Sequence, residues 1–175
     1  MPLDPSPQRE MRRALSGMQY LEAMIAGDIP ESPYNEHLGI RLTHAEPGTV
    51  MLECTVRQEH LNKIGSGHGG FVSSLLDNAC GMAVDTLTEA GRVWTSMDLH
   101  VRFLKGVTLG AGTLRIVGNA DHVGGHTSVS HAEVIRADGT VLASATSSLY
   151  ALDLAQLDRA AVASTELADA AAATA

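Results

Sequence analysis

The centre of the sequence reads Asn62-Lys-Ile-Gly-Ser-Gly-His-Gly-Gly-Phe-Val-Ser-Ser-Leu-Leu-Asp77. Residues 62–70 are mostly polar and carry four glycines, which allow the backbone to approach a ligand closely. After Gly70 the pattern changes, because apolar residues recur at helical spacing as far as Val84. The stretch therefore predicts a loop that leads into a helix and presents free backbone N–H groups at the helix N-terminus, where negative charge is favoured.

One carboxylate, Asp77, lies two turns inside this apolar helix. A carboxylate on a mostly buried helix is costly unless it has a partner or a task. The loop is not a nucleotide P-loop, because Gly69-Gly70 is followed by Phe71 and not by Lys and Ser or Thr. It also lacks the spacing and the βαβ setting of a Rossmann fingerprint, so neither of these glycine-loop motifs explains it.

The segments around this helix predict a sheet that packs against it. Six segments have strand-like patterns: residues 40–46, 49–56, 93–103, 113–122, 126–136 and 141–152. The helix itself is expected over about residues 70–89. The order is a hairpin, the helix and then an antiparallel meander, which implies an α+β fold. In it, one long helix lies across a curved antiparallel sheet of five to six strands.

An amphipathic helix is predicted before this domain. Ser6-Pro7 is typical of a helix start, and apolar residues then recur every three to four positions from Met11 to Ile25, with an end near Gly27. We expect this helix to pack on the domain or on a second subunit. The chain divides into the helix and linker (residues 1–33), the main domain (34–152) and an Ala-rich tail (153–175) with no assigned function.

The composition argues against several classes of protein. A length of 175 residues fits one domain, and the net charge of −8 argues against a general nucleic-acid binder. No apolar run approaches the roughly 20 residues of a membrane span, and the N-terminus lacks the pattern of a signal peptide. Two cysteines give neither a disulfide framework nor zinc spacing. We expect a cytoplasmic protein without nucleic-acid or membrane partners.

A metal site is not expected. His122, His126 and His131 lie close together in the sequence, but strand alternation places them on different faces of the sheet. No cysteine or carboxylate joins them at the spacing of metal ligands.

The central motif resembles the His-Gly-Gly loop and acidic helix of the PaaI-like acyl-CoA thioesterases of the hotdog-fold superfamily. The resemblance is carried by Asn62, Gly65, His68-Gly69-Gly70, Asp77, Ser96-Met-Asp98 and Phe103-Leu-Lys105, and it covers roughly residues 37–150. It implies a hotdog fold, in which a curved sheet wraps the long helix. It also implies hydrolysis of an acyl-CoA, with an aryl or medium-chain acyl group, to a carboxylic acid and CoA without a metal or cofactor.

The resemblance also implies roles for residues of the motif. Asp77 would be the nucleophile or the general base, and the Gly69 N–H would polarise the thioester carbonyl. Asn62 would orient the attacking water or the thioester, His68 would line the loop, and Ser96 would help to hold the water. A purely structural role in the loop stays open for Asn62 and His68, and simple solvent exposure stays open for Ser96.

Substrate contacts are expected around the loop and on the strand after the helix. Gly70 is a possible second donor to the carbonyl oxygen. The resemblance places Arg102, Lys105 and His126 near the CoA, and Phe71, Met82, Trp94 and Met97 are the expected lining of the acyl pocket. A solvated surface position is the alternative for each of the three basic residues.

The spacing within the motif predicts a dimer. Thioester hydrolysis needs a group that attacks or deprotonates water and donors that face the carbonyl oxygen. Gly69 and Asp77 lie about 12 Å apart along a helix axis, so one carbonyl cannot contact both. An antiparallel second helix would bring Asp77 of one chain near Gly69 of the other. We therefore expect an obligate two-fold dimer with shared sites, and the resemblance implies that two such dimers often join.

Two other functions stay open. A hotdog hydratase or dehydratase would need an acid and a base that reach the acyl Cα and Cβ, with His68 complementing Asp77. A non-catalytic acyl-CoA-binding protein would bind without turnover, although it would have no need of the Asp77 carboxylate. The sequence also leaves open whether Asp77 attacks the thioester directly or activates water.

Overall fold

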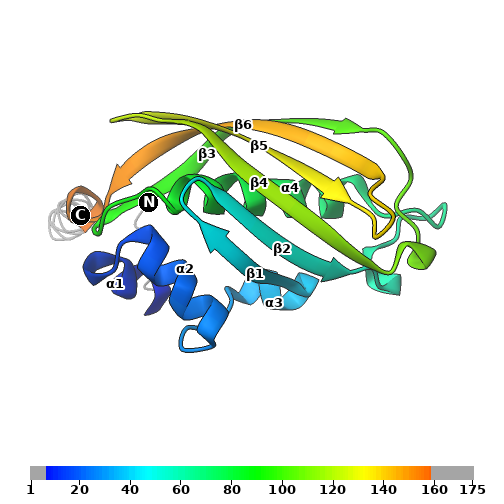
Figure 1. Cartoon of the computed structure of the whole chain (residues 1–175), viewed down its shortest axis with the longest axis horizontal. Helices are drawn as coiled ribbons and strands as arrows, with labels where there is room; N and C mark the ends of the chain where they lie inside the picture. Colours follow the sequence, from blue (N-terminus) through cyan, green and yellow to red (C-terminus); the bar gives the residue numbers. More distant parts are fainter. Residues whose placement is uncertain (1–6, 159–175) are drawn as a thin grey trace, which may run out of the picture.

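A helix across one face of a six-stranded antiparallel sheet forms the centre of the fold (Figure 1). The computed structural model describes residues 7–158, and its long helix is α4 (Gly69–Asp85). The strands are β1 (Ile40–Glu46), β2 (Thr49–Thr55), β3 (Arg92–Phe103), β4 (Thr113–Val123), β5 (Thr127–Ile135) and β6 (Val141–Asp153), in the spatial order β1-β2-β4-β5-β6-β3. The predicted hotdog architecture and its strands are thus confirmed.

The neighbours of β3 differ from the prediction. A meander after the helix would pair β3 with β4, but β3 pairs along its length with β6, from Arg92 opposite Asp153 to Phe103 opposite Ala143. Only β4, β5 and β6 form a meander, and β4 pairs with β2. The connection over residues 104–112, which contains the single turn η2 (Leu109–Ala111), carries the chain from β3 to β4, which lies beside β2. β3 therefore lies at one edge of the sheet.

The N-terminal segment forms two helices where the sequence predicted one. α1 (Pro7–Ala14) and α2 (Gly17–Ala26) are separated at Ser16. The Ser16 hydroxyl accepts the Gln19 N–H (3.3 Å), and the Gln19 side chain accepts the Ser16 N–H (3.0 Å). This reciprocal capping box starts a new helix, and Gly27 ends that helix in the left-handed conformation (φ +86°).

α1 and α2 lie beside the C-terminal end of α4 and the start of β3 (Figure 1). The short helix α3 (Pro33–Leu38) follows, and Gly39 ends it in the left-handed conformation (φ +69°). Residues 1–6 and 159–175, which include most of the predicted Ala-rich tail, lie outside the described part of the chain. The limits of the three predicted regions therefore remain predictions. Between residues 7 and 158, no helix has the length and apolar character needed to span a membrane.

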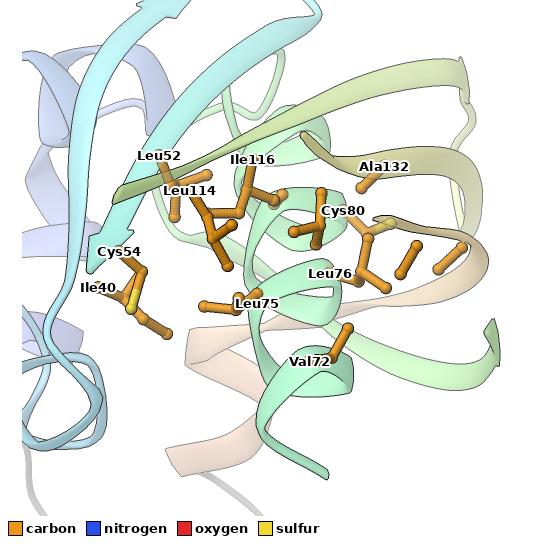
Figure 2. Packing of buried hydrophobic residues seen from close by; sticks show 14 of the residues in the cluster. Ile40, Leu52, Cys54, Val72, Leu75, Leu76, Cys80, Leu114, Ile116 and Ala132 are labelled. Atoms are coloured by element: carbon orange, nitrogen blue, oxygen red, sulfur yellow. The ribbon is translucent and has the colours of Figure 1, made fainter. Parts of the chain in front are cut away.

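The predicted apolar face of α4 packs on the sheet. The helix buries Phe71, Val72, Leu75, Leu76, Ala79, Cys80, Ala83 and Val84. Figure 2 shows Leu75 and Leu76 among buried side chains that include Leu114 and Ile116 of β4. Each fully buried aliphatic side chain of this kind stabilises the fold by about 1.5–3 kcal/mol. Cys54 and Cys80 are free and buried, and burial raises the pKa of each thiol to about 11.

α4 ends at Asp85, four residues before the predicted end. The hydroxyl of Thr86 donates to the Ala83 carbonyl (2.6 Å), and that of Thr88 donates to the Val84 carbonyl (3.0 Å). These bonds satisfy carbonyl groups that the end of a helix leaves without backbone partners.

Gly118 of β4 sets how closely α4 approaches the sheet. A Cβ built on Gly118 would overlap the carbonyl oxygen of Ala79 in α4. A side chain at this position would therefore push the helix backbone away from the strand, and only glycine permits the observed contact.

We expect Gly118→Ala to destabilise the protein, because its methyl group would force α4 away from β4. Overpacking of a well-packed interior costs about 1–3 kcal/mol, and urea unfolding should show a free energy of unfolding lower by that amount. Gly125→Ala is the matched control, since a Cβ there meets no atom within 4 Å, and it should change stability by less than about 0.5 kcal/mol. Equal stability of the two variants would contradict the proposed overlap.

Candidate functional site

The loop before α4 is held by Asn62. The Asn62 Oδ1 accepts the N–H groups of Ile64 (3.0 Å) and Ser66 (3.1 Å), and the Asn62 N–H donates to the Ser66 carbonyl (2.7 Å). Gly65 within this turn has φ +81°, a conformation that favours glycine. Asn62 thus stabilises the turn, which is the structural role that the sequence left open for this residue.

His68 caps the N-terminus of α4. Its backbone is extended (φ −61°, ψ 136°), and its Nδ1 accepts the Gly70 N–H at 2.9 Å. The Gly70 N–H is therefore already occupied. The Gly69 N–H, at the first helical position, donates to no other atom of residues 7–158. It is a free donor at the positive end of the helix dipole.

Gly69 lies at a pocket of about 330 Å³, which we call the glycine pocket. The ring of Phe103 lies over Gly69, since a Cβ built there would be 3.4 Å from the ring edge. Lys105 lies in the same lining. The full lining is Ser66, Gly67, Gly69, Val72, Phe103, Leu104, Lys105, Gly106, Val107 and Ala143.

Asp77 lies half-buried on the outward side of α4 and meets Ser96 of β3. The Ser96 hydroxyl donates to Asp77 Oδ1 at 2.7 Å, whereas Oδ2 accepts no hydrogen bond from the rest of the described chain. The two residues lie in a second pocket of about 420 Å³, which we call the carboxylate pocket. Its lining is Asp77, Asn78, Gly81, Met82, Asp85, Val93, Trp94, Thr95, Ser96 and Leu149.

The two pockets are separate within one protomer. They share no lining residue, and eight helical residues, about 12 Å of axis, separate Gly69 from Asp77. The structure therefore brings Ser96 to Asp77 and brings His68 and Asn62 to the loop, but it does not bring these two groups together in one chain.

No sequence pattern pointed to His60, yet it supports the loop. Its ring stacks on Phe71 with the centroids 4.0 Å apart and the planes 14° apart. Its Nδ1 accepts the Arg57 N–H (3.1 Å), and its carbonyl accepts the His68 N–H (2.8 Å). Burial lowers the pKa of His60, and the charge of Arg57 lowers it further. Phe71 is only 6% exposed and lines neither of the two pockets, so its contact with a substrate stays a prediction.

The other predicted contact residues are distributed over the two pockets and the surface. Met82 and Trp94 line the carboxylate pocket, and Lys105 lines the glycine pocket. Met97 and Arg102 are exposed on β3 and line neither of these pockets, and His126 is exposed between β4 and β5.

His131 of β5 lies beside a carboxylate of β4. The Nδ1 of His131 lies 2.7 Å from Asp121 Oδ1. Within the part of the chain that the structure describes, no three or more His, Cys, Asp or Glu side chains form a group that could hold a metal ion.

Comparison with known proteins finds similar sequences. Residues 65–143 match the family model described as the thioesterase superfamily. Human acyl-coenzyme A thioesterase 13 is 39% identical over 71 residues, which are 41% of this chain and 50% of that protein. The mouse protein of the same name is 31% identical over 71 residues, with the same coverage. The chain thus spans about half the length of these curated relatives.

Solved structures share the fold. The Escherichia coli PaaI protein of the phenylacetic acid degradation operon superposes with a TM-score of 0.67 at 22% identity, over 75% of this chain and 93% of that one. A thioesterase family protein from Silicibacter pomeroyi has a TM-score of 0.67 at 26% identity, over 76% and 98% of the two chains. These similarities agree with the predicted hotdog fold and with the predicted family resemblance.

The stability of the protein should depend on pH through His60. Because burial lowers its pKa in the folded protein, the unfolded chain binds a proton at His60 first as the pH falls below about 6.5. The stabilising contribution of neutral His60 is therefore complete at higher pH and is lost as the pH falls.

His60→Asn keeps an acceptor for the Arg57 N–H but cannot titrate. The difference in free energy of unfolding between wild type and variant should therefore narrow between about pH 8 and about pH 5 in urea titrations. A difference that stays constant or widens would show that His60 does not titrate in this way.

Proposed function

We propose that this chain hydrolyses an acyl-CoA thioester to a carboxylic acid and CoA. Residues 65–143 match the thioesterase superfamily model, and the fold is shared with a thioesterase family protein. The observation that carries the proposal is the presence of two half-sites on α4. The carboxylate pocket holds Asp77 with Ser96, and the glycine pocket holds the free N–H of Gly69. A thioester hydrolase needs both a group that acts on water and a donor for the developing oxyanion.

Asp77 supplies the basic group. The Ser96 hydroxyl holds Oδ1, which leaves Oδ2 to accept a proton. As the water oxygen bonds to the thioester carbon, its proton passes to Oδ2. The C–S bond then breaks, and the CoA sulfur leaves as the thiolate and takes up the proton that Asp77 accepted, which restores the carboxylate. Direct attack by Oδ2 would instead form an anhydride that water opens, with the same products.

Gly69 supplies the donor to the carbonyl oxygen. Its N–H is the first of α4, so the helix dipole adds to the positive charge that faces the oxygen. The Gly70 N–H is bonded to His68, so we assign this role to Gly69 alone. His68 and Asn62 are positioning residues in this proposal, because their hydrogen bonds hold the loop backbone in place.

Each reaction centre takes its two halves from two subunits. A two-fold axis that pairs α4 with an antiparallel α4 places the partner subunit's Gly69 near Asp77, and the two pockets then face each other. The edge position of β3 supports this arrangement. Thr95, Ser96 and Met97 are exposed there in the protomer, and a free edge can pair with another strand. A dimer of two such dimers stays a prediction of the family resemblance.

Lys105 is the cation that we assign to the CoA phosphates. It lies in the lining of the glycine pocket, beside the donor that the thioester must reach. Arg102 is exposed near the end of β3, two residues before Leu104. His126 lies near the other end of that strand, because its neighbour Thr127 pairs with Tyr150, which also pairs with Thr95 of β3. Exposed charges of this kind contribute about 1 kcal/mol or less each, so these residues affect binding more than turnover.

Asp77→Asn should remove most turnover and leave substrate binding largely intact. General-base catalysis contributes about 10²–10⁴-fold, so kcat should fall by at least about 100-fold. Thiol release from a panel of aryl and aliphatic CoA esters measures turnover, and calorimetry measures binding. Unchanged thiol release in the variant would exclude Asp77. Hydration of an enoyl-CoA by the wild type without thiol release would favour the hydratase instead.

Gly69→Pro removes the proposed donor and little else. Proline is favoured at the first position of a helix, and the extended backbone of His68 already suits a residue before proline. Loss of one oxyanion donor costs about 10²–10³-fold in kcat. Gly69→Ala is the matched control, because it keeps the N–H and its Cβ makes an ordinary contact with Phe103.

The same two variants test the shared site. In a mixed dimer of Asp77→Asn and Gly69→Pro chains, one site receives both intact residues and the other receives both substitutions. Random association makes about half of the dimers mixed, so about one quarter of wild-type activity should return on co-expression. If each site lay within one chain, mixing would restore nothing.

A further inference from the structure

The carboxylate pocket extends beyond Asp77 along α4. Gly81 lies one turn further along the helix, and Asp85 lies one turn beyond Gly81, and both residues line the pocket. A Cβ built on Gly81 meets no atom within 4 Å, so the pocket floor is open at that point. From Asp77 to Asp85 the helix spans about 12 Å. The pocket is therefore long enough for a group that extends well past the reacting carboxylate.

An ion pair closes the far end of this pocket. The Arg12 Nη2 of α1 donates to Asp85 Oδ1 at 2.7 Å and to the Arg92 carbonyl at 3.0 Å. The Arg12 Nη1 donates to the Leu15 carbonyl at 2.7 Å. Arg12 is 4% exposed, and its guanidinium lies 5.6 Å from the centre of the Tyr20 ring. These contacts fix Arg12, and Arg12 in turn fixes the Asp85 carboxylate.

The backbone of the N-terminal helices is attached to the same place. The Gly17 N–H at the start of α2 donates to the Thr88 carbonyl (2.8 Å), and the Gly91 N–H donates to the Arg12 carbonyl (2.8 Å). A Cβ on Gly17 would overlap the backbone carbonyl of Asp85. Glycine at position 17 therefore lets α2 begin directly against the last residue of α4. The end of the pocket is a rigid part of the fold.

We propose that Gly81 and the Arg12–Asp85 ion pair set the length of the acyl group that the protein accepts. The inference rests on the proposed function, because it places the thioester carbon at Asp77. From there the acyl group runs over Gly81 and beside Trp94, and it stops at the ion pair. The Trp94 ring is a fixed wall, because its Nε1–H donates to Thr88 Oγ1 at 2.7 Å.

Charge explains why the end of the pocket is a firm limit. A longer acyl group would have to separate two charges that are largely removed from water, since the side chains of Arg12 and Asp85 are 5% and 21% exposed. Breaking such a pair leaves uncompensated charge in the interior. That cost exceeds the gain from burying one more methylene group, so the pocket rejects the longer group.

Two variants should move the preferred acyl length in opposite directions. Gly81→Val fills the floor and should favour shorter groups. The paired change Arg12→Met with Asp85→Ala opens the end and leaves no buried charge without a partner, so it should favour longer groups. For each, the ratio of kcat/KM between long and short straight-chain acyl-CoA esters should change by about 10-fold or more. The dissociation constants of the same esters, measured in an Asp77→Asn background, should shift in parallel.

The outcomes separate this inference from the proposed function. If the wild type hydrolyses no acyl-CoA ester, the proposed function fails. If it is active but all three proteins prefer the same acyl length in both turnover and binding, only the length limit is wrong. Circular dichroism establishes that each variant is folded. Should the paired variant fail to fold, Gly81→Val decides alone, and an unchanged length preference in that variant overturns the inference.

Discussion

A carboxylate and a helix N-terminus that belong to one straight helix cannot approach each other. α4 holds Gly69 and Asp77 about 12 Å apart. The inner side of the helix is buried, and Gly118 brings the β4 backbone against it. Any chemistry that needs both groups must therefore use a second helix. In the proposed mechanism the dimer is a requirement of the geometry of α4 and not a later addition to a complete monomeric site.

In the loop before α4, some polar groups hold the backbone in place, and another is free to contact a substrate. The side chains of Asn62 and His68 make hydrogen bonds to the loop backbone, and the carbonyl of His60 holds the His68 N–H. These bonds occupy the Gly70 N–H and leave that of Gly69. The Gly69 N–H lies at a pocket and at the positive end of the helix dipole, so it suits a ligand oxygen that carries negative charge. Polar residues in such a motif can thus define a site without touching the substrate.

Local properties of the sequence predicted most of the fold. The alternation of apolar and polar residues in the strands, the glycine turns and the apolar spacing of α4 are all patterns among residues that are close in the sequence. The limits of the strands follow from these patterns. The break at Ser16 was also visible in the sequence, because Ser16 and Gln19 have capping-box spacing, but the continuing apolar period concealed it. The pairing of β3 with β6 could not be predicted in this way, because strand order depends on the path of residues 104–112.

Side-chain partners distant in the sequence were the least predictable part of the candidate site. Ser96 was singled out by resemblance, but its bond to Asp77 joins two different elements. The Arg12–Asp85 pair joins residues 73 positions apart, and neither residue has a motif. Burial raises the pKa of Asp85, and the charge of Arg12 opposes that rise. Such pairs are often no more stabilising than apolar residues of the same size. The more informative property of this pair is therefore its position. One contact anchors the N-terminal helices and holds Asp85, which lines the carboxylate pocket, and this is why we propose that the N-terminal segment limits that pocket.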